Sequence, residues 1–357
     1  MRIGIITQPL ISNYGGILQN YALQRVLIRM GHTPITIDLL LPRHSKDKIK
    51  HIVQALLHLR WPNRWENPHR RRREINKFTN KHIKKTYPVG KYSAFLVNLY
   101  KLDTLIAGSD QIWRPQYNYY YPDHLYDMYF RFAESLPIGK IVYAASFGTE
   151  DWEYNPEQTE CCRSLVHKID AVSVREKSGV ALCRQYFGIE AQWVLDPTLL
   201  LDAEDYEKLC AHIPRPEHPF IAVYLLDIDA KFAGKVEKIG KQLELPLRFF
   251  SEGDIMALSI EEWLAMFRDA KYIITDSFHG TVFSIIFNKP FISIGNEARG
   301  MSRFLSLLKQ FGLEERLSPE CSADTLLRPI LWDEVNNRKR ILQKRSIAFL
   351  EKNLNVH

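Results

Sequence analysis

The chain of 357 residues is 46% hydrophobic and 25% charged, which is typical of a globular protein of two domains, and no apolar run reaches the roughly eighteen residues of a membrane span. Its formal charge of +7 is local: residues 43–91 hold fifteen Lys or Arg and three Asp or Glu, a net +12 that leaves −5 elsewhere and argues against a nucleic-acid-binding protein. Five cysteines without a CxxC pair or a Cys/His metal spacing predict reduced thiols in a cytoplasmic protein and no metal site.

The chain opens with the pattern of a strand, a loop and a helix. Residues 2–6 predict a strand, and residues 17–30 have the apolar spacing of a helix that Gly31 would end. The loop could hold a carboxylate or phosphate at the helix N-terminus, or it could be a tight turn that needs glycine. The residues concerned are Asn13, Tyr14, Gly15 and Gly16.

The basic segment 43–91 follows a second strand at 34–40. Its apolar positions, with Trp61 and Trp65, are typical of an amphipathic helix that contacts an anionic membrane at the inner face of the cell membrane. The alternative is a solvated helical insertion that packs on the core.

Several strands then end in polar residues, and the alternation of strands with helices predicts a parallel, doubly wound sheet. Residues 102–107 lead to Asp110, which could act as a general base, orient an acceptor hydroxyl or cap a helix. Residues 140–145 predict the next strand. Residues 171–174 lead to Arg175, whose guanidinium could pair with a donor phosphate or carboxylate, or form a surface ion pair with the adjacent glutamate.

A second set of strands and helices starts after the proline-rich stretch 213–219, which is the best linker candidate. Phe304, Leu305 and Leu308 are expected to pack one helical face on the second sheet. We therefore predict an α/β protein with two Rossmann-like domains in a GT-B-like architecture and a site in the interdomain cleft. The domains are residues 1–213, on the acceptor side, and 219–330, on the donor side, followed by a C-terminal helix in 331–357.

His279 is the most informative residue of the second half. The strand 272–274 leads into a polar turn, and residues 282–287 begin a helix, so His279 is expected on a loop beside the helix amides. In open α/β sheets ligands bind at the carboxyl ends of the strands. A histidine there could transfer a proton next to an anion that the helix amides hold. The alternative is a loop histidine that only bonds its surroundings. Arg299 and Arg303 could bind the same anion or be solvated.

Taken in order, these motifs resemble the polysaccharide pyruvyl transferase family over about residues 1–315. The resemblance implies transfer of a pyruvyl group from phosphoenolpyruvate, as co-substrate and without another cofactor, to a sugar of a bacterial envelope glycan or its lipid-linked precursor, forming a cyclic ketal. It is carried by the loop with Asn13 and Gly15-Gly16, and by Gly108-Ser109-Asp110-Gln111-Ile112-Trp113, Val174-Arg175-Glu176-Lys177-Ser178, Asp196-Pro197-Thr198 and Ser277-Phe278-His279-Gly280-Thr281.

By this resemblance His279 is the catalytic acid/base and Arg175 a donor-binding arginine, and Asp110 is the candidate for the acceptor hydroxyl. Family members usually carry an arginine two residues before the histidine, where this chain has Ser277. Arg299 or Arg303 would have to replace that charge. The remaining expected donor residues are Ser277, Gly280 and Thr281, and the expected acceptor residues are Asn13, Tyr14, Gly15, Gly16, Gln111 and Trp113.

Two other classes of function remain open from the sequence. A GT-B glycosyltransferase that uses a sugar nucleotide would share the fold, so the fold alone does not decide between them. A non-catalytic scaffold of an envelope-assembly complex would bind glycan without turning over any donor.

Overall fold

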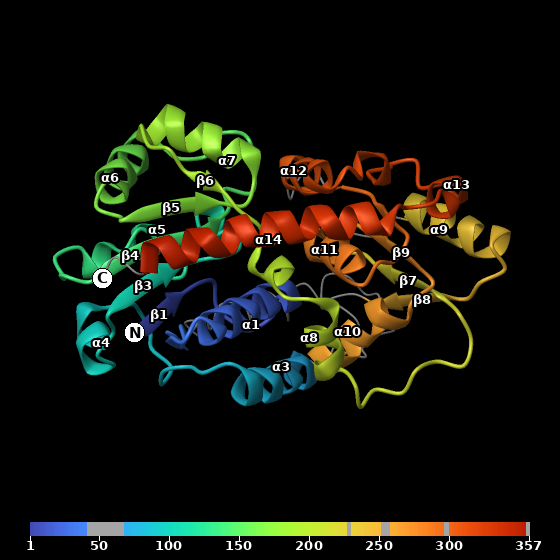
Figure 1. Cartoon of the computed structure of the whole chain (residues 1–357), viewed down its shortest axis with the longest axis horizontal. Coiled ribbons are helices and arrows are strands. Elements are labelled where there is room, and N and C mark those ends of the chain that lie inside the picture. The colour runs from blue at the N-terminus through green and yellow to red at the C-terminus, as the bar shows by residue number, and fades with distance from the viewer. Residues whose placement is uncertain (41–67, 227–229, 251–257, 296–299, 355–357) are drawn as a thin grey trace, which may run out of the picture.

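The computed structural model describes residues 1–40, 68–226, 230–250, 258–295 and 300–354. Two lobes lie side by side, each built around its own parallel sheet, and a long helix runs across both (Figure 1). The two predicted Rossmann-like halves are therefore present.

In the described part of the chain, the first sheet is parallel throughout. The order of its strands reverses at β1, because β2 lies on one side of β1 and β3 on the other. Alternate side chains point to opposite faces, so Ile3 and Ile5 join one hydrophobic cluster while Ile6 joins another. In sheet order the strands are β2 (Thr33–Thr36), β1 (Arg2–Ile6), β3 (Thr104–Ala107), β4 (Gly139–Ala145), β5 (Ala171–Val174) and β6 (Gln192–Trp193).

The helices of this lobe pack on the faces of the first sheet and on its edge. They are α1 (Tyr14–Arg29), α3 (Pro68–His82), α4 (Ala94–Leu99), α5 (His124–Asp127), α6 (Pro156–Val166), α7 (Lys177–Leu182) and α8 (Ala203–Leu209). Short 3-10 turns are η1 (Pro115–Tyr117), η2 (Arg131–Ala133) and η4 (Pro197–Leu200), and η3 (Cys183–Phe187) is a π-helical turn.

The second sheet is smaller, and its described strands are also parallel. Its order is β10-β9-β7-β8, so the reversal lies between β7 and β9. The strands are β7 (Ile221–Tyr224), β8 (Leu247–Phe250), β9 (Tyr272–Thr275) and β10 (Phe291–Ser293). The helices of this lobe are α9 (Ala230–Gln242), α10 (Ile260–Asp269), α11 (Phe278–Ile286), α12 (Met301–Phe311) and α13 (Ala323–Leu327), with a 3-10 turn η5 (Glu314–Arg316).

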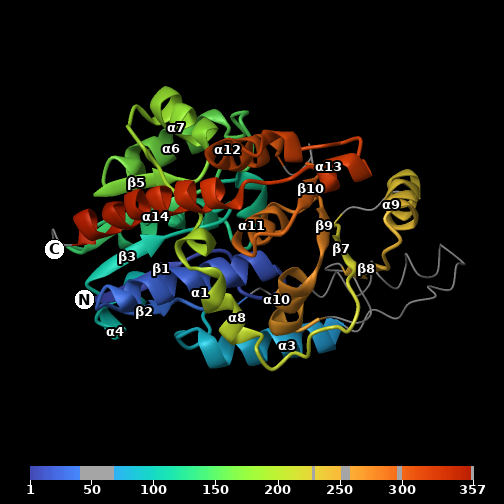
Figure 2. The same cartoon turned by 45° about the vertical axis from the view of Figure 1, so that its right-hand side comes forward.

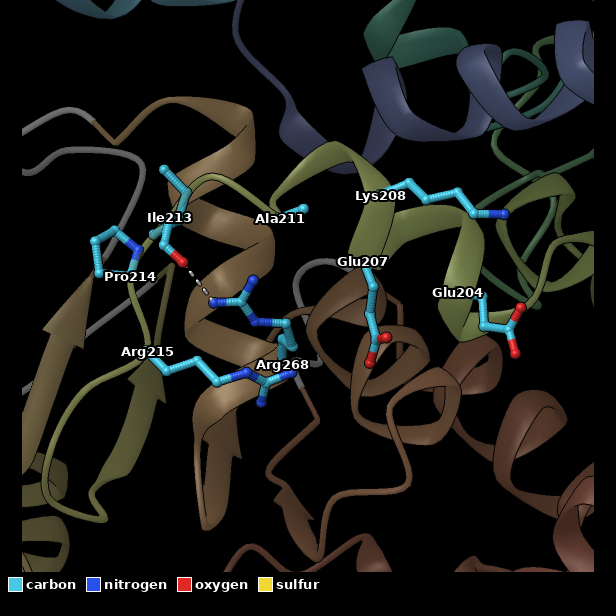
Figure 3. A pocket seen from close by; sticks show the side chains of 8 residues that line it. All are labelled: Glu204, Glu207, Lys208, Ala211, Ile213, Pro214, Arg215 and Arg268. Atoms are coloured by element: carbon cyan, nitrogen blue, oxygen red, sulfur yellow. Dashed lines mark hydrogen bonds between the residues drawn. The ribbon is translucent and has the colours of Figure 1, made fainter.

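Three features join the lobes. Helix α14 (Trp332–Leu354) begins at the second lobe and returns across the first, so both chain ends lie at the same side (Figures 1 and 2). The predicted linker connects the two lobes, and its start is held by α10: the Arg268 guanidinium donates to the carbonyl oxygens of Cys210 and Ile213 (Figure 3). A single hydrophobic cluster contains side chains from both sheets. The lobes are thus packed against each other.

Helix starts are the main difference from the sequence prediction. Helix α1 starts at Tyr14 and not at residue 17, because the Asn13 side chain accepts the Gly16 amide and caps the helix. Helix α11 starts at Phe278 and not at residue 282, since the Ser277 hydroxyl accepts the Gly280 amide. His279 therefore lies in the first turn of a helix and not on a loop.

Two predicted packing features can also be compared with the structure. Phe304 and Leu308 are buried as expected, but Leu305 is 46% exposed, so its assignment to the buried face was wrong. Residues 43–67 of the basic segment, with Trp61 and Trp65, lie outside the described residues. The described helix α3 buries Ile75 and Phe78, as expected for an insertion that packs on the core.

Candidate active site

The points where the strand order reverses in the two sheets face a common cavity. It has a volume of about 260 Å³ and takes residues from the carboxyl ends of β1 and β3 in one lobe and of β7 and β9 in the other. Ligands of open α/β sheets bind at such reversals. The residues that line it are Gln8, Pro9, Ile11, Ser12, Asn13, Asp110, Gln111, Tyr117, Tyr120, Leu226, Asp276, Ser277, Phe278, His279 and Arg303.

The first turns of α1 and α11 meet at this cavity. A Cβ atom built on Gly15 would lie only 2.0 Å from Nδ1 of His279, so only glycine lets the two helix starts approach this closely. Tyr14 does not line the cavity: it is buried, stacks on Trp263 of α10 and donates its hydroxyl to the carbonyl of Leu258. Its predicted role in acceptor binding is replaced by interdomain packing.

His279 faces a buried carboxylate of the other lobe. Its Nε2 lies 3.8 Å from Oδ2 of Asp196 and has no hydrogen-bond partner among the described residues. Burial alone would raise the pKa of Asp196, but His279, Arg175 and the Thr198 hydroxyl outweigh it and hold that pKa well below its usual range. Asp196 is therefore a permanent negative charge behind the imidazole, suited to orienting it.

Arg175 lies behind the cavity and not in it. Its side chain is 1% exposed, and its guanidinium pairs with Asp196 at 2.7 Å and with Asp110 at 3.1 Å. The Glu176 carboxylate is 3.9 Å away and accepts hydrogen bonds from Ser146 and two backbone amides. The predicted direct contact with a donor is therefore not present in this geometry, because carboxylates already surround the guanidinium. Arg175 instead positions Asp110 and Asp196.

Asp110 is held at the cavity wall from two sides. One carboxylate oxygen accepts from Asn13 at 3.0 Å and the other from Arg175. Its backbone adopts a φ of 72°, a sparsely populated conformation that is concentrated at functional sites. Each carboxylate oxygen keeps a lone pair with which to accept a substrate hydroxyl.

Arg303 brings positive charge to the cavity. It is the only Lys or Arg among the described lining residues, and its guanidinium lies 5.5 Å from the centre of the Phe278 ring. Burial and the nearby Arg175 lower the pKa of Arg303 to about 10, so it remains charged at neutral pH. A desolvated cation beside a helix N-terminus favours an anionic ligand. Arg299, the other expected replacement, lies outside the described residues.

Comparison with known proteins gives the family. The model of the family described as polysaccharide pyruvyl transferase matches residues 13–298, which include Asp110 and His279 from the two sides of the cavity but not Gln8 or Arg303. The chain belongs to the polysaccharide pyruvyl transferase family. The resemblance expected from the sequence motifs is confirmed, and the members of this family are enzymes. No protein with a curated description matches the chain in sequence.

Solved structures place this pyruvyl transferase in the GT-B-like fold. UDP-GlcNAc 2-epimerase from Methanocaldococcus jannaschii is 14% identical, with a TM-score of 0.56 over 99% of this chain and 100% of that one. S. aureus MnaA, in a co-structure with UDP, is 11% identical, with a TM-score of 0.51 over 97% and 91% of the two chains. The predicted GT-B-like fold is confirmed.

The structure separates the remaining expected site residues of the pyruvyl transferase. Asn13, Gln111 and Ser277 line the cavity, and Gly15 and Gly16 lie beside it. Trp113 was expected to bind the acceptor but is fully buried and stacked on Tyr129, so it is a core residue. Gly280 and Thr281 also lie off the cavity wall: the Gly280 amide is used by the Ser277 cap, and the Thr281 hydroxyl contacts Ser293.

Sequence reasoning assigned no role to several functional candidates. Asp196 was noted only as part of a motif, although it follows a strand of the same sheet as Asp110 and Arg175. Strand ends of one parallel sheet meet at one edge, and this rule would have found it. Gln8 and Tyr120 lie in loops, and Tyr117 ends the short 3-10 turn η1, so no periodic pattern marked them.

A second, more open hollow of about 480 Å³ lies at the linker. Glu207, Arg215 and Arg268 are among its lining residues, and none of the strand-end residues reaches it (Figure 3). Of the two cavities, only the smaller one is lined by the strand-end residues. Among the described residues, no group of three or more His, Cys, Asp or Glu is placed to hold a metal ion.

Proposed function

We propose that this protein transfers the pyruvyl group of phosphoenolpyruvate to two hydroxyls of a sugar in a bacterial envelope glycan or its lipid-linked precursor. The observation that carries the proposal is the cavity itself. It combines a histidine backed by a carboxylate, His279 and Asp196, with a buried cation, Arg303, in a chain of the pyruvyl transferase family.

The donor would lie on the wall made by the second lobe. Phosphoenolpyruvate carries a phosphate and a carboxylate, and Arg303 and the first amides of α11 are suited to hold them. Arg303 would supply the charge that Ser277 lacks. His279, in the first turn of α11, would then lie next to the vinyl group of the donor.

The reaction needs one proton donor and one group that orients the acceptor. His279 protonates C3 of the donor, which becomes a methyl group, and one sugar hydroxyl bonds to C2. A second hydroxyl then bonds to C2 as the C2–O bond to phosphate breaks. Of the two hydroxyl protons, one balances the proton gained by C3 and the other leaves with phosphate. Asp110 accepts a hydrogen bond from the attacking hydroxyl.

The direct test is to incubate the enzyme with phosphoenolpyruvate and candidate envelope sugars, free and lipid-linked, and to follow phosphate release. Release that depends on a sugar supports the proposal. Binding of a nucleoside diphosphate in calorimetry, with no effect of phosphoenolpyruvate, would point to a glycosyltransferase instead. Binding of glycan without turnover of any donor would point to a scaffold.

Arg303→Met is expected to weaken phosphoenolpyruvate binding by roughly 10–100-fold, since one charge-assisted hydrogen bond is worth about 1.5–3 kcal/mol. Calorimetric titration of the donor measures this. Lys309→Met, an exposed charge on the same helix, is the matched control and should bind donor as the wild type does. Arg303→Lys keeps the charge and should recover part of the affinity. Equal donor affinity in all four proteins would remove Arg303 from the donor site.

We also propose that the acceptor is met at a membrane surface. No helix in the described ranges is long and apolar enough to cross a bilayer. Tyr87, Phe95 and Leu99 are 85%, 68% and 57% exposed, and the backbone amide of Tyr87 donates to the Tyr100 hydroxyl at the end of α4, which brings them together. Exposed Lys84, Lys91 and Lys101 neighbour them in sequence, a mixture that suits an anionic interface.

The protein is accordingly expected to co-sediment with anionic vesicles, less so as salt rises. Replacing Lys84 and Lys91 by glutamine should weaken this binding roughly 10–30-fold, at about 1 kcal/mol per charge. Arg184→Gln, at an exposed arginine in the turn η3, is the control. Wild-type protein that stays in the supernatant at low salt would refute membrane contact.

A further inference from the structure

The wall of the cavity that comes from the first lobe differs chemically from the wall of the second. Among the described lining residues it contributes Tyr117, Tyr120, Gln8 and Gln111, and no Lys or Arg. Two aromatic rings flanked by two amides form an amphipathic surface, and Asp110 is the one charged residue on this wall in the described ranges. The lining cation, Arg303, comes from α12 of the second lobe, so the first lobe adds no positive charge that would bind an anion.

Neighbouring side chains fix the turn and the ring of Tyr117 on this wall. The Asn118 side chain donates to the carbonyls of Ile112 and Arg114, both at 2.8 Å, and so fixes the turn that carries Tyr117. The Arg114 guanidinium lies 5.4 Å from the centre of the Tyr117 ring and is itself paired with Glu153 at 2.9 Å. The ring therefore keeps its position without a ligand, which lowers the entropy lost on binding.

Tyr120 is anchored in the same way by aromatic neighbours. Its ring packs edge-to-face on His124, with centroids 4.9 Å apart, and is tilted against Tyr119 at 4.8 Å. Burial lowers the pKa of His124 to about 4, so this support is neutral. Burial and Tyr119 raise the pKa of Tyr120 above its usual value, so its hydroxyl remains a hydrogen-bond donor.

The side-chain oxygen of Gln8 has no hydrogen-bond partner among the described residues. Its Nε2 donates to the Asn118 side chain at 3.1 Å, which fixes the amide. Its Oε1 is buried and accepts no hydrogen bond from the described residues. Buried polar atoms nearly always have a hydrogen-bond partner. We therefore expect a bound ligand to donate a hydrogen bond to this oxygen, for example from a hydroxyl.

We infer that Tyr117, Tyr120 and Gln8 form the subsite for the acceptor sugar, and that they select an uncharged pyranose ring. Such a ring has an apolar C–H face, which packs on an aromatic ring, and hydroxyls at its edge, which bond to amides. Asp110 lies on the cavity wall contributed by the same lobe, where it would meet the reacting hydroxyl of that ring. This inference rests on the proposed function, since it names the substrate class of the same cavity.

The first test measures binding without turnover. Saturation-transfer NMR with neutral methyl hexopyranosides at millimolar concentration should give a signal with wild-type protein. That signal should be lost in Tyr117→Ala and reduced in Gln8→Leu, and it should be kept in Tyr117→Phe, which retains the ring. Tyr87→Ala, at a tyrosine that is 85% exposed and does not line the cavity, is the matched control. Uridine is the competitor to include, because a nucleobase could also stack here.

The second test uses the reaction. In the phosphate-release assay, Tyr117→Ala and Gln8→Leu should each raise the acceptor KM about tenfold and leave the phosphoenolpyruvate KM unchanged. An unchanged acceptor KM in both variants, or uridine rather than a hexoside bound at Tyr117, would overturn the inference. A wild-type enzyme that binds hexosides through these residues but never consumes phosphoenolpyruvate would refute the proposed function and leave the sugar subsite standing.

Discussion

Replacing His279 with alanine is expected to lower the turnover of phosphoenolpyruvate by roughly 10²–10⁴-fold while the fold remains intact. Loss of a positioned acid or base typically has an effect of this size. The imidazole lines the cavity in the first turn of α11, and the buried Asp196 carboxylate stands 3.8 Å behind it. Phosphate release at saturating donor and acceptor measures the change.

Three controls make this result specific to His279. His167→Ala, at an exposed histidine of the first lobe, should turn over at the wild-type rate. His279→Gln fills most of the same space without an acid/base group and should be as inactive as the alanine variant. Donor binding and melting temperature should change little in either His279 variant. Near-normal turnover in His279→Ala would remove this residue from the mechanism.

Replacing Arg175 with methionine is expected to destabilise the protein by about 3–5 kcal/mol. Methionine fills similar space, but it leaves the buried Asp110, Asp196 and Glu176 without their common cation. This outcome differs from the donor-binding role expected from the sequence, in which affinity would change more than stability. Urea unfolding, followed by circular dichroism, measures the loss.

The pH dependence separates this explanation from simple loss of packing. Burial already raises the native pKa of Glu176, and loss of Arg175, the strongest influence that lowers it, raises that pKa further. That group then contributes stability below its unfolded pKa and loses it as pH rises through the native pKa. The difference between wild type and variant should therefore be smaller at pH 5 than at pH 8. Arg184→Met, which breaks the exposed ion pair with Glu190, should unfold at nearly the wild-type urea concentration at both values. A pH-independent loss would point to packing alone.

Much of the fold could be predicted because its signals are local. Buried strands such as β1 and β9 are short apolar runs, and polar residues follow them directly, so the strand ends that carry Asp110 and His279 were found from the sequence. The helix starts were missed because the glycines after Asn13 and Ser277 were interpreted as parts of loops. The side chains of Asn13 and Ser277 accept hydrogen bonds from the amides of Gly16 and Gly280, and these bonds cap the two helices ahead of the glycines.

The direction in which side chains point could not be predicted, because it depends on residues far away in the chain. Trp113 follows a strand end as Asp110 does, but it turns into the core onto Tyr129. Arg175 is sequestered by Asp110 and Asp196, which lie 65 and 21 residues away in sequence. Neither outcome follows from local propensity, since each depends on how neighbouring strands are ordered in the sheet.

The contact between Gly15 and His279 also limits how the two halves of this enzyme can be exchanged between relatives. Each half has its own sheet, but α14 of the second half packs on β4 and η4 of the first, so a chimera joined within residues 213–219 must also preserve that contact to fold. Activity would require more under the proposed mechanism, because His279, its proposed acid/base, comes from one parent, and the adjacent Asp196 and Gly15 come from the other. Recombination in this family should therefore yield active hybrids only when all three positions are inherited as a matched set.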